Sequence, residues 1–130
     1  MREFRANAEN ELVDAATYIS NEIKSGAKVV FFSGDLGAGK TALIKRILEM
    51  HDIEARKVKS PTYVIKRQHN QFHHVDLYRL AKVDPDELGL KEDDVYLIEW
   101  AEKLDQQIDP DLRVSISIND DDSRTITVDR

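Results

Sequence analysis

The stretch SGDLGAGKT, residues 33–41, constrains the fold of this 130-residue chain more than any other part of the sequence. It fits the spacing G-x-x-x-x-G-K-[ST] with Gly34, Gly39, Lys40 and Thr41. The apolar run at 28–32 is typical of a buried strand, and residues 40–50 repeat apolar side chains at helical spacing. In this strand–loop–helix order, backbone N–H groups turn inward above the positive end of the helix. The sequence therefore predicts a loop that binds the phosphates of a nucleotide.

The motif also predicts a role for each part of the loop. Lys40 is expected to reach the β- and γ-phosphates, and the Thr41 hydroxyl is expected to bind Mg²⁺. The residues expected to line the nucleotide are Asp35, Leu36, Gly37, Ala38, Gly39, Lys40, Thr41 and Ala42.

A Mg²⁺ ion at such a loop needs a carboxylate at the end of a neighbouring strand. Glu99 follows the apolar run VYLI, and Asp76 follows the more polar run FHHV. One carboxylate would bind the metal or its water shell while the other positions or activates a water molecule. The sequence leaves this division open. Thr62, in the stretch SPTY, is a candidate for a second hydroxyl ligand of Mg²⁺.

The rest of the chain predicts the fold around this site. We expect a helix over 7–25 capped by Asn7, strands over 62–67 and 72–79, a short helix over 84–90, a strand over 95–100, and a hairpin formed by 112–118 and 123–128. The predicted fold is α/β: a three-layer P-loop sandwich with a mixed, mostly parallel sheet, helices on both faces and a C-terminal antiparallel hairpin. We expect a single domain over residues 1–130.

The composition excludes several classes of site. The chain has no cysteine, which excludes disulfides, thiolate zinc sites and cysteine nucleophiles. The net charge of −6 argues against non-specific binding of nucleic acid by the chain alone. No apolar run approaches 18 residues and the first ten residues lack a hydrophobic signal core, so we expect no membrane association and a cytoplasmic location.

Four motifs occur in one order along the chain: GDLGAGKT, SPTY, HVDLYR and LIEWAE. Together they resemble the TsaE family, also called YjeE, the small bacterial P-loop ATPases of tRNA threonylcarbamoyladenosine synthesis. The resemblance covers about Lys28 to Leu104. Near the start of the first helix, Leu12 stands about where the family has a threonine.

The resemblance implies ATP and Mg²⁺ as cofactors, Lys40, Asp76 and Glu99 as catalytic residues, and Trp100 beside the nucleotide. It also implies that Thr41, Thr62, Asp76 and Glu99 line the metal and γ-phosphate region. By this resemblance, the chain would bind the TsaD and TsaB proteins and meet tRNA only through that complex. We expect slow ATP hydrolysis by the chain alone, because its sequence shows no arginine finger.

Other functions of a phosphate-binding loop remain alternatives. A small P-loop kinase that phosphorylates a metabolite needs a lid and an acceptor pocket, for which 130 residues leave little chain. A nucleotide-binding scaffold without turnover is a second alternative. A GTPase is not favoured, because the guanine-reading pattern Asn-Lys-x-Asp does not occur. The adjacent His73 and His74 should point to opposite faces of a strand, so no joint metal site is expected there.

Overall fold

The computed structural model describes residues 1–53 and 66–130. Thr62 and most of the strand expected over 62–67 therefore lie outside the described residues. In chain order the elements are β1 (Arg2–Ala6), η1 (Glu9–Leu12), α1 (Val13–Lys24), β2 (Val29–Ser33), α2 (Lys40–Glu49), β3 (Lys66–His69), β4 (Phe72–Asp76), η3 (Pro85–Leu88), β5 (Val95–Glu99), η4 (Ala101–Lys103), β6 (Leu112–Ile118) and β7 (Arg124–Asp129).

The described strands form one mixed sheet in the order β1-β7-β6-β2-β5-β4-β3. The four central strands, β6, β2, β5 and β4, are parallel to one another, and the strands that flank them form antiparallel pairs at both edges. β2 and β5 occupy the centre because their apolar runs can be buried on both faces. The mixed sheet with a C-terminal antiparallel hairpin, β6–β7, is confirmed.

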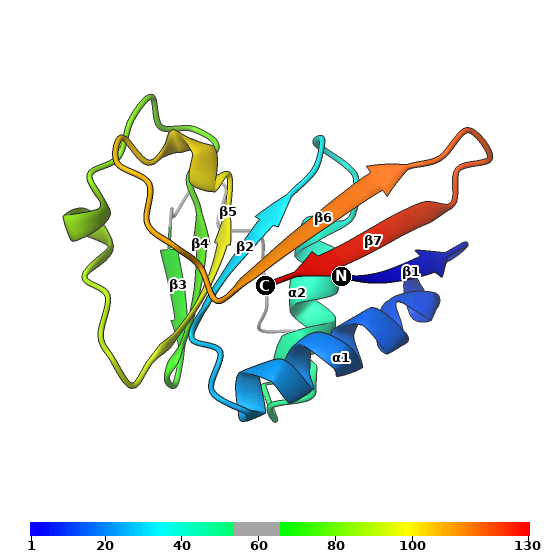
Figure 1. The fold of residues 1–130 in the computed structure, drawn as a ribbon, viewed down its shortest axis with the longest axis horizontal. Coiled ribbons are helices and arrows are strands. Elements are labelled where there is room, and N and C mark those ends of the chain that lie inside the picture. The colour runs from blue at the N-terminus through cyan, green and yellow to red at the C-terminus, as the bar shows by residue number, and fades with distance from the viewer. Residues whose placement is uncertain (54–65) are drawn as a thin grey trace.

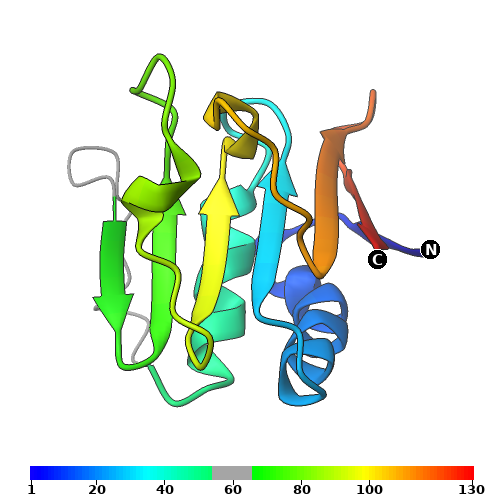
Figure 2. The same ribbon diagram turned by 60° about the vertical axis from the view of Figure 1, so that its left-hand side comes forward.

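The two faces of the sheet are covered differently (Figure 1). The α1 and α2 helices share one core with the sheet, in which Ile19, Leu43 and Leu97 are fully buried. The opposite core contains Val83, Leu88 and Leu104. The segments that connect β4 to β5 and β5 to β6 cover this face of the sheet (Figure 2). The predicted fold class is confirmed with one difference: in the described residues, this second face carries the 3₁₀ helices η3 and η4 in place of α-helices. The segments that connect β4 to β5 and β5 to β6 are short and contain prolines and a glycine, which favours tight turns over a long helix.

The N-terminal segment differs from the helix expected over 7–25. Residues 2–6 form the edge strand β1, paired with β7, and α1 begins only at Val13. Asn7 is not a side-chain cap; its backbone N–H donates to the Glu11 carboxylate at 3.0 Å. A five-residue strand with three charged or polar positions carries little periodic signal, so pairing with β7 decides its conformation.

The cap of the short helix after β4 is as predicted. Asp84 accepts the backbone N–H of Asp86 at 2.9 Å, with Pro85 in the first helical position. The helix itself is a single 3₁₀ segment that ends at Gly89. None of the helices in the described residues is long and apolar enough to cross a membrane.

Candidate functional site

The glycine-rich loop leaves the carboxyl end of β2 and enters α2, as the motif predicts. Gly39 is the N-cap of α2 and has a φ of 115°, a backbone conformation that side-chain-bearing residues rarely adopt. A Cβ at Gly34 would lie 2.5 Å from the carbonyl oxygen of Ile116 on β6. The loop therefore packs closely against the C-terminal hairpin and requires glycine at both ends.

Lys40 is the first residue of α2 and is 5% exposed. Its ammonium group donates a hydrogen bond to the Gly34 carbonyl and lies 4.0 Å from the centre of the Trp100 ring. Burial lowers the pKa of Lys40, whereas the negative charges of Glu99 and Asp76 raise it. The structure thus places a buried cation that contacts the loop in the same cavity as two carboxylates.

Asp76 and Glu99 are paired neighbours at the carboxyl ends of the parallel strands β4 and β5. Glu99 is 3% exposed, and its Oε2 atom accepts a hydrogen bond from the Thr41 hydroxyl at 3.2 Å. The Oδ1 atom of Asp76 accepts the backbone N–H of Tyr78 at 3.0 Å. Three of the four expected Mg²⁺ contacts, Thr41, Asp76 and Glu99, therefore lie at one end of the sheet.

A cavity of about 260 Å³ joins these side chains to the loop. It is lined by Leu36, Gly37, Gly39, Lys40, Thr41, Ala42, Asp76, Tyr78, Glu99 and Trp100. Asp35, expected at the nucleotide, is exposed and lines neither this cavity nor a second cavity on the opposite side of the loop, which is described below. Ala38 lines only the opposite cavity.

Trp100 follows Glu99 directly and has a left-handed backbone, with a φ of 62°. A residue with a bulky side chain is strained by about 1–3 kcal/mol in this left-handed backbone conformation, and such residues cluster at functional sites. Its ring packs against Tyr78 at 4.9 Å between centroids and covers Lys40. The strained turn after β5 therefore directs the indole ring toward the cavity.

Sequence reasoning missed one residue of this site, His74. It is fully buried, and its Nε2 atom lies 2.6 Å from the Oε2 atom of Glu99. His73 points to the opposite face, as predicted, where it contacts Asp94 and stacks on Tyr96. The alternation of side chains along a strand could have identified it. His74 precedes Asp76 by two residues and therefore lies on the same face of β4.

The described residues offer protein oxygens of the kind that phosphate-bound Mg²⁺ uses. No group of three His, Cys, Asp or Glu side chains suited to hold a metal ion occurs in residues 1–53 and 66–130. Mg²⁺ commonly uses one or two protein oxygens together with substrate phosphates and water. Thr41, Asp76 and Glu99 match that smaller set of protein oxygens.

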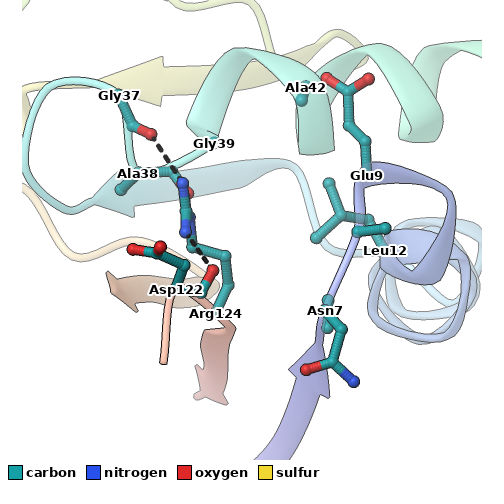
Figure 3. A pocket seen from close by; sticks show the side chains of 11 residues that line it. Asn7, Glu9, Leu12, Gly37, Ala38, Gly39, Ala42, Asp122 and Arg124 are labelled. Carbon is teal, nitrogen blue, oxygen red and sulfur yellow. Dashed lines mark hydrogen bonds between the residues drawn. The ribbon is translucent and has the colours of Figure 1, made fainter. Parts of the chain in front are cut away.

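A second cavity, of about 310 Å³, lies on the other side of the loop (Figure 3). It is lined by Ala6, Asn7, Ala8, Glu9, Leu12, Gly37, Ala38, Gly39, Ala42, Asp122 and Arg124. Because Gly37, Gly39 and Ala42 border both cavities, the loop forms the wall between them.

Because Asp76 is partly buried, its ionisation should make the free energy of unfolding depend on pH. Desolvation raises the pKa of Asp76 above its ordinary value of 3.8, and the charge of Glu99 raises it further. The folded state therefore holds the Asp76 proton more tightly than the unfolded chain does, and its ionisation above pH 3.8 costs stability. Asp76→Asn keeps the acceptor for Tyr78 and removes the charge, so its stability relative to wild type should increase as the pH rises.

Urea unfolding without Mg²⁺ between pH 3.5 and 7 measures this difference. Asp93→Asn, at an exposed acid between η3 and β5, is the control and should show a smaller pH-dependent difference. A difference between Asp76→Asn and wild type that does not change with pH would contradict the assignment.

The central parallel strands, the glycine loop that caps α2 and the carboxylates at the adjoining strand ends define an α/β protein of the P-loop type. The family model for threonylcarbamoyl adenosine biosynthesis protein TsaE matches residues 6–126. This chain belongs to the TsaE family.

Individual relatives agree with this assignment. The tRNA threonylcarbamoyladenosine biosynthesis protein TsaE of Haemophilus influenzae is 41% identical over 112 residues, covering 77% of this chain and 68% of that protein. The protein of the same name from Rickettsia bellii is 32% identical over 131 residues, covering 94% and 90%. The crystal structure of Bacillus subtilis YdiB has a TM-score of 0.68 and 28% identity, covering 98% of this chain and 83% of that one.

Proposed function

We propose that this chain is a Mg²⁺-dependent ATPase whose hydrolysis supports TsaD and TsaB in the threonylcarbamoyladenosine modification of tRNA. The family assignment supports the biosynthetic role. The observation that carries the ATPase proposal is the convergence of Lys40, Thr41, Asp76 and Glu99 on one cavity at the loop. A cytoplasmic location and contact with tRNA only through the partner proteins are part of this proposal.

The two cavities suggest how a nucleotide would lie across the loop. The phosphates would occupy the loop, with the γ-phosphate toward Asp76 and Glu99, because bound Mg²⁺ would need those oxygens. The nucleoside would extend toward the second cavity, where Leu12 and Asn7 form part of the wall. The first helical turn would therefore meet the nucleoside through an apolar leucine side chain.

Bound Mg²⁺ would neutralise charge on the β- and γ-phosphates. Lys40 would leave the Gly34 carbonyl and bind the same phosphates, because its flexible side chain already lines the cavity. Glu99 would orient the attacking water through the carboxylate oxygen that Thr41 and His74 leave free, Oε1. Trp100 would exclude solvent from the cavity.

Phosphate release and product analysis separate this proposal from its alternatives. The wild-type chain with Mg²⁺ and ATP should release phosphate slowly when alone and faster when TsaD and TsaB are added. A binding scaffold would release no phosphate in either case. A kinase would transfer the phosphate to an added metabolite, so labelled product in place of inorganic phosphate would contradict the proposal.

The contact between His74 and Glu99 allows a second test of the same site. Because a carboxylate only accepts, the His74 Nε2–H donates to Glu99 and fixes the Oε2 atom. His74→Leu removes this donor and should lower turnover by about 10- to 100-fold, the usual effect of losing a group that orients a site residue. His74→Gln places an amide N–H near the same position and should recover part of the loss.

The matched control is His73→Gln, on the opposite face of β4, which should leave turnover within a few-fold of wild type. Titration of ATP into each folded variant separates binding from turnover. Unchanged turnover in folded His74→Leu would contradict a role for His74 in orienting Glu99.

A further inference from the structure

Arg124, the first residue of β7, contacts the glycine-rich loop on the side of the second cavity. Its Nε atom donates to the Ala38 carbonyl at 3.0 Å, and its Nη2 atom donates to the Gly37 carbonyl at 3.4 Å. Its Nη1 atom donates to the Asp122 carbonyl at 2.7 Å, which anchors the guanidinium to the hairpin turn (Figure 3). One side chain thus joins two consecutive loop carbonyls to β7, 86 residues away in sequence.

These bonds determine which way the loop's peptide groups face. In a planar trans peptide, a carbonyl and the following N–H point in opposite directions. Because Arg124 holds the Ala38 carbonyl, the N–H of Gly39 must point away from the guanidinium. A phosphate-binding loop needs its N–H groups directed at the ligand, and glycines allow many other backbone conformations.

The same hairpin supports the start of the loop. Gly34 packs against the Ile116 carbonyl of β6 so closely that a Cβ would not fit. The hairpin's own turn is fixed, because Asp121 accepts the hydroxyl and backbone N–H of Ser123 at 2.6 and 3.1 Å. β6 and β7 therefore contact both halves of the loop and are part of the site.

We propose that Arg124 is a positioning residue that holds the loop open for the phosphates of a nucleoside di- or triphosphate before the nucleotide arrives. This inference rests on the proposed function. It predicts that Arg124 affects nucleotide affinity and leaves the chemical step nearly unchanged, because the contacts are made equally in the ground state and the transition state.

The test compares Arg124→Gln and Arg124→Lys with wild type. Arg124→Gln should weaken ADP and ATP binding by a similar factor of about 10 to 100, raise KM, and leave kcat within about twofold. Arg124→Lys keeps the charge but can replace only some of the guanidinium hydrogen bonds. Its nucleotide affinity should therefore lie between that of wild type and that of Arg124→Gln. Amide hydrogen exchange without nucleotide should be faster in the loop of Arg124→Gln than in wild type.

The matched control is Arg5→Gln. Arg5 is an exposed arginine on the neighbouring strand β1 that pairs with Asp121 of the same hairpin turn and is not among the described residues that line either cavity at the loop. The Arg5→Gln substitution should leave the nucleotide affinity and the rate of amide hydrogen exchange in the loop unchanged.

The outcomes separate this inference from the proposed function. If wild type binds nucleotide and folded Arg124→Gln binds it equally well with unchanged loop exchange, Arg124 has no positioning role. If kcat falls while KM is unchanged, Arg124 acts in the chemical step and the inference is wrong. If wild type itself binds no nucleotide, the proposed function fails, and faster loop exchange in Arg124→Gln would still support the structural role.

Discussion

Replacing Lys40 by alanine is expected to lower ATP hydrolysis by about 10²- to 10³-fold, the usual loss when one preorganised donor to a transition state is removed. Lys40 is buried, lines the same cavity as the two carboxylates and is affected by their charge. Without it, none of the described residues that line the cavity would bring a positive charge to phosphates beside Asp76 and Glu99. ATP affinity should fall as well, because the ammonium group contacts the bound phosphates before and during the reaction.

The matched control is Lys45→Ala, on the same helix and outside the residues that line the cavity. Phosphate release at saturating ATP, measured beside an ATP titration, separates lost chemistry from lost binding. A Lys40→Ala chain that hydrolyses ATP at the wild-type rate would show that this loop is not the catalytic site.

Replacing Glu99 by alanine is expected to leave nucleotide binding nearly intact and to lower turnover by about 10²- to 10⁴-fold, the range for a residue that positions or activates a reacting water. Glu99 lies at the end of β5, and two buried contacts hold its Oε2 atom. Removing the carboxylate also leaves Thr41 and His74 without their acceptor, at a cost of about 1–3 kcal/mol in the free energy of unfolding.

Glu99→Gln separates these two effects, because glutamine retains an acceptor oxygen and the side-chain volume but removes the charge. Glu102→Ala removes a carboxylate whose charge raises the pKa of Lys40 and which is not among the residues that line the cavity, and it should change turnover little. Equal turnover in wild type and both Glu99 variants would contradict the assigned role.

The sequence predicted the central elements well because their signals are local. The loop motif requires a strand before it and a helix after it, and β2 and α2 lie within one residue of the expected bounds. Glu99 and Asp76 could be paired in advance, because parallel strands bring their carboxyl ends to one edge of a sheet.

The residues that sequence reasoning missed depend on contacts between distant segments. The hydrogen bond from His74 to Glu99 needs the register of β4 against β5, which no local pattern specifies. Arg124 reaches the loop only because β7 lies beside β6, and β6 beside β2. The edge strand β1 likewise owes its conformation to β7.

The most direct test of the proposed function is multiple-turnover formation of threonylcarbamoyladenosine on tRNA by TsaD and TsaB, supplied with an activated threonylcarbamoyl donor, this chain and ATP. With the wild-type chain, the modified tRNA should exceed the amount of TsaD–TsaB many times. With Glu99→Ala, or without this chain, formation should stop near one equivalent. Equal yields from wild type and Glu99→Ala would contradict the claim that ATP hydrolysis by this chain supports repeated turnover of its partners.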